Sequence, residues 1–299
     1  MNSKTKNLSS KYLPYAFISP AIILIAAFLV YPVYNVFYYS MQNYNAAKPW
    51  INGFIGFDNF IEIFTQDKIF FPSLLVSLKW VFCEISLQFT LGLILALILN
   101  KTFRLRGLAR AAVFAPWAIS GVLTSMIWSL MYNGQMGVIN DLLLKTGIIH
   151  SPIAWLANMN VVFGSVVVAE LWRGIPFFAI MILAGLQGIP NEIYEACEMD
   201  GGNKLHKFYY IIIPFLKDTI VLSTLLRTVW EFNNVDLIYT LTGGGPAHAT
   251  TTLVMYIANT ATRDSNFGYG SALAVIAFFI LLIFAIIYLK LSNFGKEEM

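Results

Sequence analysis

The chain has 299 residues, of which 58% are hydrophobic and 12% are charged, and its mean hydropathy is +0.68. A soluble domain carries about 25% charged residues, so this composition excludes a soluble globule, and the high hydrophobicity excludes a disordered chain. The net charge of +3 and the lack of a dense run of Lys and Arg argue against nucleic-acid binding. A membrane protein with several spans remains, since one span needs roughly 20 apolar residues.

Six apolar runs follow one another along the chain, and each is long enough to cross a membrane as a helix. Helix breakers interrupt several of them, including Pro32, Pro116, Gly121, Gly174 and Pro176. Such breakers are tolerated where neighbouring helices satisfy the freed backbone groups. We therefore expect an all-α membrane protein in which residues 1–299 form one transmembrane domain. The expected spans are about 13–40, 72–99, 111–132, 161–186, 212–234 and 268–289.

The Lys and Arg residues of the loops predict the orientation, because they are enriched on the cytoplasmic side. Eleven lie on the side that holds both termini and the loops 100–110 and 187–211, against four on the other side. Both termini are therefore expected in the cytoplasm, which agrees with an even number of spans. Residues 187–211 then form a short cytoplasmic loop, and residues 235–267 form a long, glycine-rich external connection.

The cytoplasmic loop carries the most informative motif of the chain. Pro190 can open a short polar helix over 191–199, which Gly201 and Gly202 would end. A second short helix then leads to Pro214 and the fifth span. A charged connector of this kind is usually only solvated, but here the spacing of the residues favours a docking element.

Three residues separate a Glu-Ala-Cys triplet from a glycine, and nine more separate that glycine from Ile-x-Ile-Pro. This spacing resembles the EAA loop of ABC-importer permeases, which reads Glu-Ala-Ala, three residues, Gly, nine residues, Ile-x-Leu-Pro. In that family the loop is the coupling helix that docks into a cleft on the ATPase subunit. Cys197 and Ile213 depart from the pattern, and each is close in size or character to the residue it replaces. The resemblance implies ATPase-coupling roles for Glu195, Ala196, Cys197, Asp200, Gly201 and Pro214.

Three further segments extend the resemblance over about residues 12–292. Residues 56–60 look like the external segment of the family, and residues 183–187 precede the loop as they do in sugar permeases. Residues 241–252, followed by Tyr256, are similar to the signature of the first permease subunit of maltose-, glycerol-phosphate- and multiple-sugar-type importers. The external motif of that signature is Gly243, Gly244, Gly245 and Pro246.

The resemblance implies a type I ABC-importer permease of a bacterial or archaeal cytoplasmic membrane, working by alternating access. It implies as partners a second, similar permease subunit, two ATPase subunits and an extracytoplasmic solute-binding protein. The chain contains no Gly-x-x-x-x-Gly-Lys-[Ser/Thr] phosphate loop, so ATP and Mg²⁺ are expected on the ATPase, with no cofactor and no enzyme activity here. A carbohydrate is the expected substrate. An oligosaccharide is favoured, because a phosphorylated one would need a denser basic path.

Charged residues inside spans are costly and are functional candidates by default. Glu170 and Arg173 share one face of the fourth span, beside an expected break at Gly174 and Pro176. They are predicted either to form an internal ion pair or to belong to a gate on the substrate path. Lys79 and Glu84, five residues apart in the second span, face different sides and are expected to pair elsewhere or to snorkel.

The end of the fifth span supplies the candidate sugar site. Trp230 offers an aromatic face, while Glu231, Asn233 and Asn234 offer hydrogen bonds to hydroxyl groups. In maltose-type permeases the corresponding stretch is rich in asparagine and lines the sugar site, which favours Glu231 and Asn234. The alternative is an interfacial belt in which Trp230 is an anchor and Arg227 pairs with Glu231.

Trp128 and Tyr132 lie on one face of the third span and are weaker substrate candidates, because such aromatic pairs more often pack. The three histidines do not converge on a metal site, and no nucleophile and base lie together. Two other classes of protein stay open. A stand-alone, ion-coupled secondary transporter would use Glu170 and Arg173 for coupling and would show internal repeats, none of which is apparent. A membrane enzyme would need a cluster of catalytic groups.

Overall fold

The computed structural model describes residues 3–295, with side chains from residue 12 onward. Lys296, which was counted for the orientation, lies outside the described residues, as do the side chains of Lys4, Lys6 and Lys11. The described part is mostly helical, as predicted. Its strands form one short antiparallel ribbon of β1 (Gln42–Asn43) and β2 (Gly53–Phe54).

Five helical segments of the described chain are long and apolar enough to cross a membrane. A pair of helices, Arg106–Ala118 and Gly121–Met131, passes the same test together but is bent by 98°. Counted as one broken span, the pair brings the total to the predicted six. The five continuous segments are Tyr12–Ser40, Phe70–Asn100, Val162–Gln187, Lys204–Phe232 and Phe267–Leu291.

The bend of the third span follows from its sequence. Pro116 lacks a backbone N–H and lies in the short 3₁₀ helix η3 (Ala115–Ala118), after which Ile119 and Ser120 are extended. Ser120 then starts a new helix, because its hydroxyl oxygen accepts the backbone N–H of Leu123 at 3.3 Å. The break lies between two of the predicted breakers, Pro116 and Gly121.

The break expected at Gly174 and Pro176 is wrong, because α8 (Val162–Gln187) runs through both residues without interruption. A proline inside a helix removes one backbone hydrogen bond and crowds the preceding turn. Here Pro176 is buried, and the adjacent Phe177 and Phe178 pack in an apolar cluster. The surrounding packing therefore holds the helix through the proline.

Contacts divide the chain into two compact units. The first unit consists of Met1–Asp67 and Ile257–Phe278. Within it, the Asn59 amide donates to the carbonyl oxygens of Ser40 and Gln42, both at 2.9 Å, and the Tyr269 hydroxyl donates to Asp67 at 2.7 Å. Its elements are α1 (Ser3–Ile25), the π-helical η1 (Ala26–Val30), α2 (Tyr31–Ser40), β1, η2 (Pro49–Ile51), β2, α3 (Asp58–Thr65) and parts of α13 (Leu253–Thr262) and α14 (Phe267–Leu291).

The second unit consists of Lys68–Tyr256 and Phe279–Met299, and its centre is formed by α4, α8 and α11. α4 and α8 approach closely at Gly92, where an added Cβ would lie 2.6 Å from the Cβ of Phe178. The single-domain prediction for 1–299 stays a prediction. The elements of this unit are α4 (Phe70–Asn100), α5 (Arg106–Phe114), η3, α6 (Gly121–Met131), α7 (Val138–Lys145), α8, α9 (Asn191–Met199), α10 (Lys204–Lys207), the π-helical η4 (Phe208–Ile212), α11 (Ile213–Phe232), α12 (Asp236–Thr242) and the remaining parts of α13 and α14.

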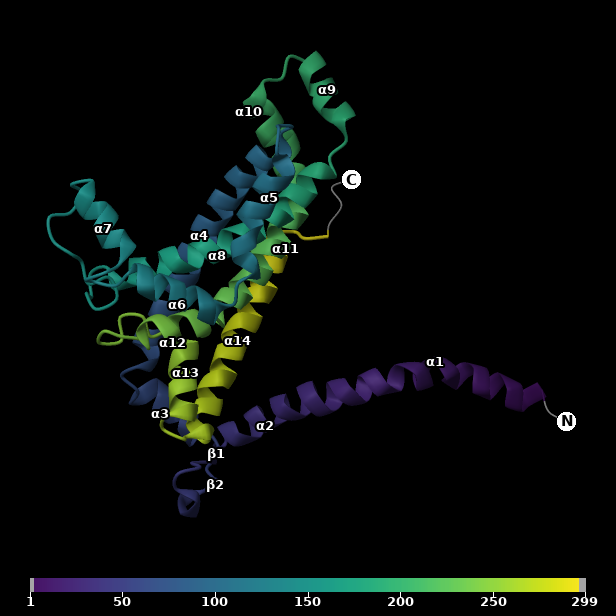
Figure 1. Cartoon of the computed structure of the whole chain (residues 1–299). Coiled ribbons are helices and arrows are strands. Elements are labelled where there is room, and N and C mark those ends of the chain that lie inside the picture. The colour runs from purple at the N-terminus through teal and green to yellow at the C-terminus, as the bar shows by residue number, and fades with distance from the viewer. Residues whose placement is uncertain (1–2, 296–299) are drawn as a thin grey trace. The chain divides into compact units, whose positions relative to one another are not determined.

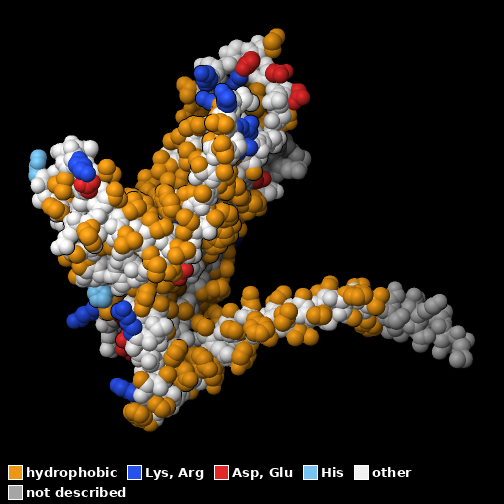
Figure 2. All heavy atoms as spheres, in the orientation of Figure 1, with side chains coloured by type: hydrophobic (Ala, Val, Ile, Leu, Met, Phe, Trp, Pro, Cys, Tyr) orange, Lys and Arg blue, Asp and Glu red, His pale blue; other side chains and the backbone are white. Residues whose placement is uncertain are grey.

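Two apolar clusters fill the second unit. The first joins Trp80 of α4 to α6, α8 and α12. The second joins Leu99 of α4 to α8, α11 and the partly buried side of α9. In Figure 1, α9 and α10 lie at one end of the unit, and α6 and α12 lie toward the other. Hydrophobic side chains cover the flank between the ends, and charged side chains gather at the α9–α10 end (Figure 2), which is the surface that a membrane-spanning unit needs.

Candidate functional site

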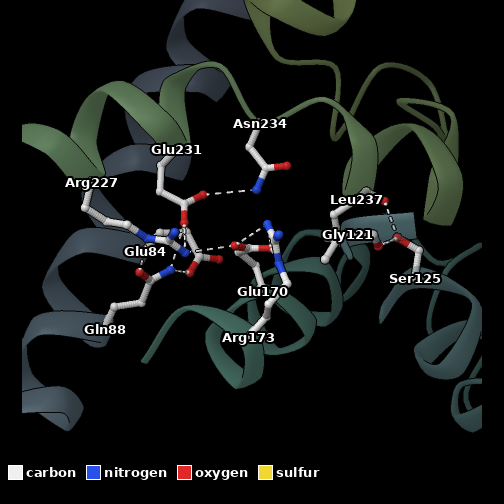
Figure 3. A network of polar contacts seen from close by, with 10 residues as sticks. All are labelled: Glu84, Gln88, Gly121, Ser125, Glu170, Arg173, Arg227, Glu231, Asn234 and Leu237. Carbon is white, nitrogen blue, oxygen red and sulfur yellow. Dashed lines mark hydrogen bonds and ion pairs between the residues drawn. The ribbon is translucent and has the colours of Figure 1, made fainter. Parts of the chain in front are cut away.

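A layer of polar side chains crosses the second unit between the two apolar clusters (Figure 3). Glu84, Gln88 and Glu170 are 0% exposed, and Glu231 is 1% exposed. Groups this deep in a membrane protein persist when they pair with one another. We call this layer the charge network, and its members are Glu84 and Gln88 of α4, Glu170 and Arg173 of α8, Arg227 and Glu231 of α11, and Asn234.

Arg227 lies at the centre of the charge network. Its Nη2 is 3.0 Å from Oε1 of Glu170 and 2.7 Å from Oε1 of Glu231, and its Nε donates to Oε1 of Gln88 at 2.8 Å. The Gln88 amide in turn donates to Glu84 and to Glu231, both at 2.9 Å. One arginine and one glutamine thus connect three spans that are far apart in the sequence.

Both ion pairs that the sequence suggested as alternatives exist. Arg173 Nη2 is 2.8 Å from Oε1 of Glu170, and Arg227 pairs with Glu231 as described. Asn234 donates from its amide to Oε2 of Glu231 at 3.3 Å. The Glu231 carboxylate is therefore buried and held by Arg227, Gln88 and Asn234. Contact of Glu231 with a sugar stays a prediction, and so does a gating role for Glu170 and Arg173.

Three participants were not predicted from the sequence. Glu84 and Gln88 lie four residues apart, and polar residues at that spacing in an apolar helix were a usable signal. Gly174 is the third, because an added Cβ would lie 2.3 Å from Nε2 of Gln88 and 2.5 Å from Nη2 of Arg227. The Lys79 ammonium lies 4.2 Å from the ring centre of Phe163, while Glu84 accepts a hydrogen bond from Gln88, so each of the two has a partner elsewhere.

Glu84 is incompletely paired. Its Oε2 accepts from Gln88, while its Oε1 is buried and has no hydrogen-bond partner in the described part of the chain. The charge network contains three carboxyl groups and only two guanidinium groups. One carboxyl group is therefore not matched by a cation.

The aromatic and amide candidates at the end of α11 lie nearer the surface. Trp230 is 43% exposed and packs one side against Phe177, with 5.3 Å between ring centres. Asn233 is exposed and donates to the carbonyl oxygen of Val229, while Asn234 is half-buried. In this conformation Trp230, Asn233 and Asn234 are the accessible members of the predicted sugar site.

Trp128 and Tyr132 pack and also border open space. Their ring centres are 5.3 Å apart, and the Tyr132 hydroxyl donates to the carbonyl oxygen of Ser165 at 2.9 Å. Both are buried in the first apolar cluster. They also line a cavity of about 630 Å³ together with Trp155, Asn160 and Val168. Packing is therefore established for this pair, and contact with a substrate stays a prediction.

The loop that carries the motif folds into the two predicted helices, α9 and α10. Ile193, Tyr194 and Cys197 pack inward on the second apolar cluster, which leaves Glu195 and Ala196 exposed. Burial raises the pKa of the Tyr194 phenol above its ordinary value, an effect that the charge of Lys207 partly opposes.

The geometry of the turn between α9 and α10 requires glycine at two positions. Gly201 has a φ of +81°, a left-handed conformation that residues with a Cβ rarely adopt. Gly202 has no room for a Cβ, which would lie 2.3 Å from the sulfur of Cys197. Asn203 caps α10 through its side-chain oxygen, and an ion pair between Lys207 and Glu198 ties the two helices together. Asp200 is exposed, and Pro214 lies in the first turn of α11.

The predicted external motif forms a loop closed on itself. Gly243 and Gly244 have φ values of +60° and +88°, and Gly245 and Pro246 follow directly. Thr250 donates its hydroxyl to the carbonyl oxygen of Gly245 at 3.0 Å. The loop is thus held by hydrogen bonds between threonine hydroxyls and its own backbone.

Comparison with known proteins decides the family. The model for binding-protein-dependent transport system inner membrane components matches residues 88–293. The chain belongs to this family. It is a multi-pass membrane permease subunit of an ABC importer, which confirms the family predicted from the loop motif.

Relatives and solved structures refine this assignment. A trehalose/maltose transport system permease protein of Thermococcus litoralis is 35% identical over 99% of both chains. A sulfoquinovosyl glycerol transport system permease protein of Agrobacterium fabrum is 33% identical over 95% of this chain and 92% of its own length. A chain of a bacterial alginate ABC transporter, crystallised with its pentasaccharide-bound periplasmic protein, matches with a TM-score of 0.83 and 20% identity over 99% and 100% of the two chains. The fold is therefore that of a type I importer permease, as predicted.

Proposed function

We propose that this chain is a permease subunit of an ATP-driven importer that carries a carbohydrate, and specifically an oligosaccharide, across the cytoplasmic membrane. The observation that carries the proposal is the α9–α10 loop, whose exposed Glu195 and Ala196 and whose glycine turn resemble the coupling loop of the family. The sugar-transport names of the similar permeases support the substrate class. Both termini and the α9–α10 loop would then lie in the cytoplasm, as the Lys and Arg distribution predicts.

The partners follow from the same proposal. A second, similar permease subunit completes the pathway, two ATPase subunits bind ATP and Mg²⁺, and an extracytoplasmic binding protein delivers the sugar. The alginate transporter crystallised with its periplasmic protein supports the last of these. Glu195, Ala196, Cys197, Asp200, Gly201 and Pro214 are the proposed ATPase-coupling residues, and this chain binds no cofactor itself.

The helix that follows the loop suggests how the motion is transmitted. α10, η4 and α11 form one helical segment from Lys204 to Phe232. At 1.5 Å per residue, about 40 Å of helix joins Lys204 to Glu231. Arg227 and Glu231 of α11 are joined to α4 and α8 by hydrogen bonds and an ion pair. A displacement of the loop would therefore move three spans together and open the substrate path to one side of the membrane and then to the other.

The proposed path uses the residues at the end of α11 and near the broken third span. Trp230, Asn233 and Asn234 would contact the sugar, and the charge network behind them would hold their position. Opening of the network during transport would also expose Glu231 to the sugar. The proposed path residues are Glu231, Asn234, Asn233, Trp230, Trp128, Tyr132, Glu170 and Arg173, and the proposed external motif is Gly243, Gly244, Gly245 and Pro246.

Reconstitution into vesicles tests the proposal. Uptake of a labelled oligosaccharide such as maltose or trehalose is expected only when the chain, its partner permease, the ATPase and the binding protein are all present with ATP. Uptake by the isolated chain in an ion gradient would instead support a secondary transporter. Asn233→Ala and Trp230→Ala should raise the sugar concentration needed for half-maximal uptake and leave assembly unchanged. Unchanged sugar dependence in both variants would remove these residues from the path.

A further inference from the structure

The stretch from Lys101 to Arg110, which joins α4 to α5 and includes the start of α5, is the most basic segment of the chain. Four cations lie within ten residues, and no acidic residue occurs between Glu84 and Asp141. Leu99 of α4, Ala109 of α5 and Ile193 of α9 share the second apolar cluster, so the segment belongs to the same end of the unit as the α9–α10 loop. We call it the basic segment, and its cations are Lys101, Arg104, Arg106 and Arg110.

Two of these arginines have no anionic partner in the part of the chain that the structure describes. Arg106 and Arg110 lie one turn apart on α5, where side chains are neighbours, and both are half-buried. The Nε atom of each is buried and has no hydrogen-bond partner, and neither arginine forms an ion pair with a described residue. Arg110 donates from Nη2 to the carbonyl oxygen of Leu99 at 3.2 Å. Two neighbouring guanidinium groups repel each other unless an anion joins them.

Exposed apolar side chains alternate with the cations. Phe103, Leu105 and Leu108 are 42%, 65% and 67% exposed. Leu105 is held outward with a φ of +66°, which is uncommon for a residue with a Cβ. Large apolar side chains beside Lys and Arg are typical of a segment that lies in the membrane interface. A purely protein-facing or purely solvated basic surface would not need them.

We propose that Arg106 and Arg110 bind the phosphate group of an anionic phospholipid, while Phe103, Leu105 and Leu108 insert among its acyl chains. The planar guanidinium group of arginine matches the geometry of a phosphate and can donate two parallel hydrogen bonds to its oxygens. Lys101 and Arg104 add attraction to the anionic membrane surface. The lipid would fill the place of the missing anion at the junction of α4 and α5, beside the loop proposed to meet the ATPase.

Lipid counting on the purified full chain tests this without any transport assay, so it does not depend on the sugar or on the partners. The chain in nanodiscs of phosphatidylcholine with a minor fraction of phosphatidylglycerol is released into the mass spectrometer, and the bound lipids are counted. Wild type should retain phosphatidylglycerol at least severalfold above its fraction in the nanodisc. R106Q/R110Q should lose this enrichment, and R106K/R110K, which keeps the charge without the guanidinium group, should keep part of it.

A charge-matched control is K48Q/K68Q, which removes two exposed cations far from the basic segment in the sequence and should keep the full enrichment. The proposal fails if wild type shows no preference for phosphatidylglycerol, a result that does not depend on whether any variant folds. It also fails if inorganic phosphate displaces the lipid from wild type. It fails equally if R106Q/R110Q keeps the full enrichment of wild type, which would place the bound lipid elsewhere on the chain.

Discussion

The charge network and the α9–α10 loop differ in where their partners lie. Three hydrogen bonds of the network join residues 57, 139 and 143 positions apart, and its carboxyl groups are almost fully buried. The loop is local: Glu198 and Lys207, nine residues apart, close it, and Glu195 stays exposed. Apart from Oε1 of Glu84, the network is therefore paired inside the chain, whereas the loop leaves Glu195 exposed, where we propose that the ATPase completes it.

Because of this difference, we expect substitutions in the network to affect the stability of the fold and substitutions in the loop to affect coupling to the ATPase. A buried charge that loses its partner has no water to replace it. Removing one member of a buried ion pair therefore leaves an unpaired charge that lowers the free energy of unfolding strongly. An exposed carboxylate is solvated with or without its partner, so its loss changes stability little. Changes in the network should act on the free energy of unfolding, and changes in the loop on the transmission of ATP hydrolysis to transport. The predictions below are ordered by their expected effect on stability.

The largest effect is expected for Glu170→Ala. Both Arg173 and Arg227 pair with this carboxylate, so its removal takes the direct partner of two guanidinium groups and leaves Glu231 as the carboxylate that pairs with Arg227. Breaking a buried pair costs about 3–5 kcal/mol. Thermal unfolding of the purified chain in detergent should show a clear drop in midpoint and yield. Asp141→Ala is the control, since it breaks an exposed pair with Lys145 worth about 0.2–1 kcal/mol.

The next effect is expected for Gly174→Ala, which adds one methyl group where Gln88 and Arg227 meet. The new Cβ would lie 2.3 Å from Gln88 and 2.5 Å from Arg227, so both side chains must move although their partners hold them. Overpacking of this kind costs about 1–3 kcal/mol. Gly164→Ala, on the same helix with nothing within 4 Å, should unfold at or above the wild-type temperature. Equal midpoints for the two variants would show that the network is loosely held.

Local signals account for what could be predicted. The six spans, the two helices of the loop and the break near Pro116 each depend on contiguous residues, and so do the pairs Glu170–Arg173 and Arg227–Glu231. Which faces of α4, α8 and α11 meet is not a local property: the spacing of Glu84 and Gln88 marks a polar face of α4 but does not identify its partners on the other two helices. Gln88 and Glu84 were therefore missed.

Pro176 shows the limit of the same reasoning in the other direction. A proline and a glycine two residues apart form a strong local breaker signal, yet α8 continues through them. Burial of Pro176 and the packing of Phe177 and Phe178 against neighbouring helices decide the outcome. Near Pro116, Ile119 is half-buried and Ser120 is exposed and supplies a new cap, so nothing equivalent holds the helix together.

A smaller effect is expected for Glu84→Gln, although Glu84 is as deeply buried as Glu170. The amide oxygen can still accept from Gln88, and the change leaves two carboxyl groups for two guanidinium groups. Stability should stay within about 1 kcal/mol of wild type, since charge balance improves while the hydrogen bond is kept. Glu84→Ala, which loses the hydrogen bond and leaves a cavity, should be clearly less stable. A Gln variant as unstable as the Ala variant would contradict this account of the network.

The smallest effect on stability is expected for Glu195→Ala, because its side chain is exposed on α9 and contributes to no recorded ion pair of the described chain. Surface substitutions of this kind change the free energy of unfolding by about 0.5 kcal/mol or less. The same variant should nonetheless lose transport-coupled ATP hydrolysis in vesicles with the full set of partners. Glu192→Ala removes the same charge from the same helix outside the motif and should keep coupling. If both variants couple normally, the loop is not completed by the ATPase, and the contrast between an internally satisfied network and an externally satisfied loop no longer holds.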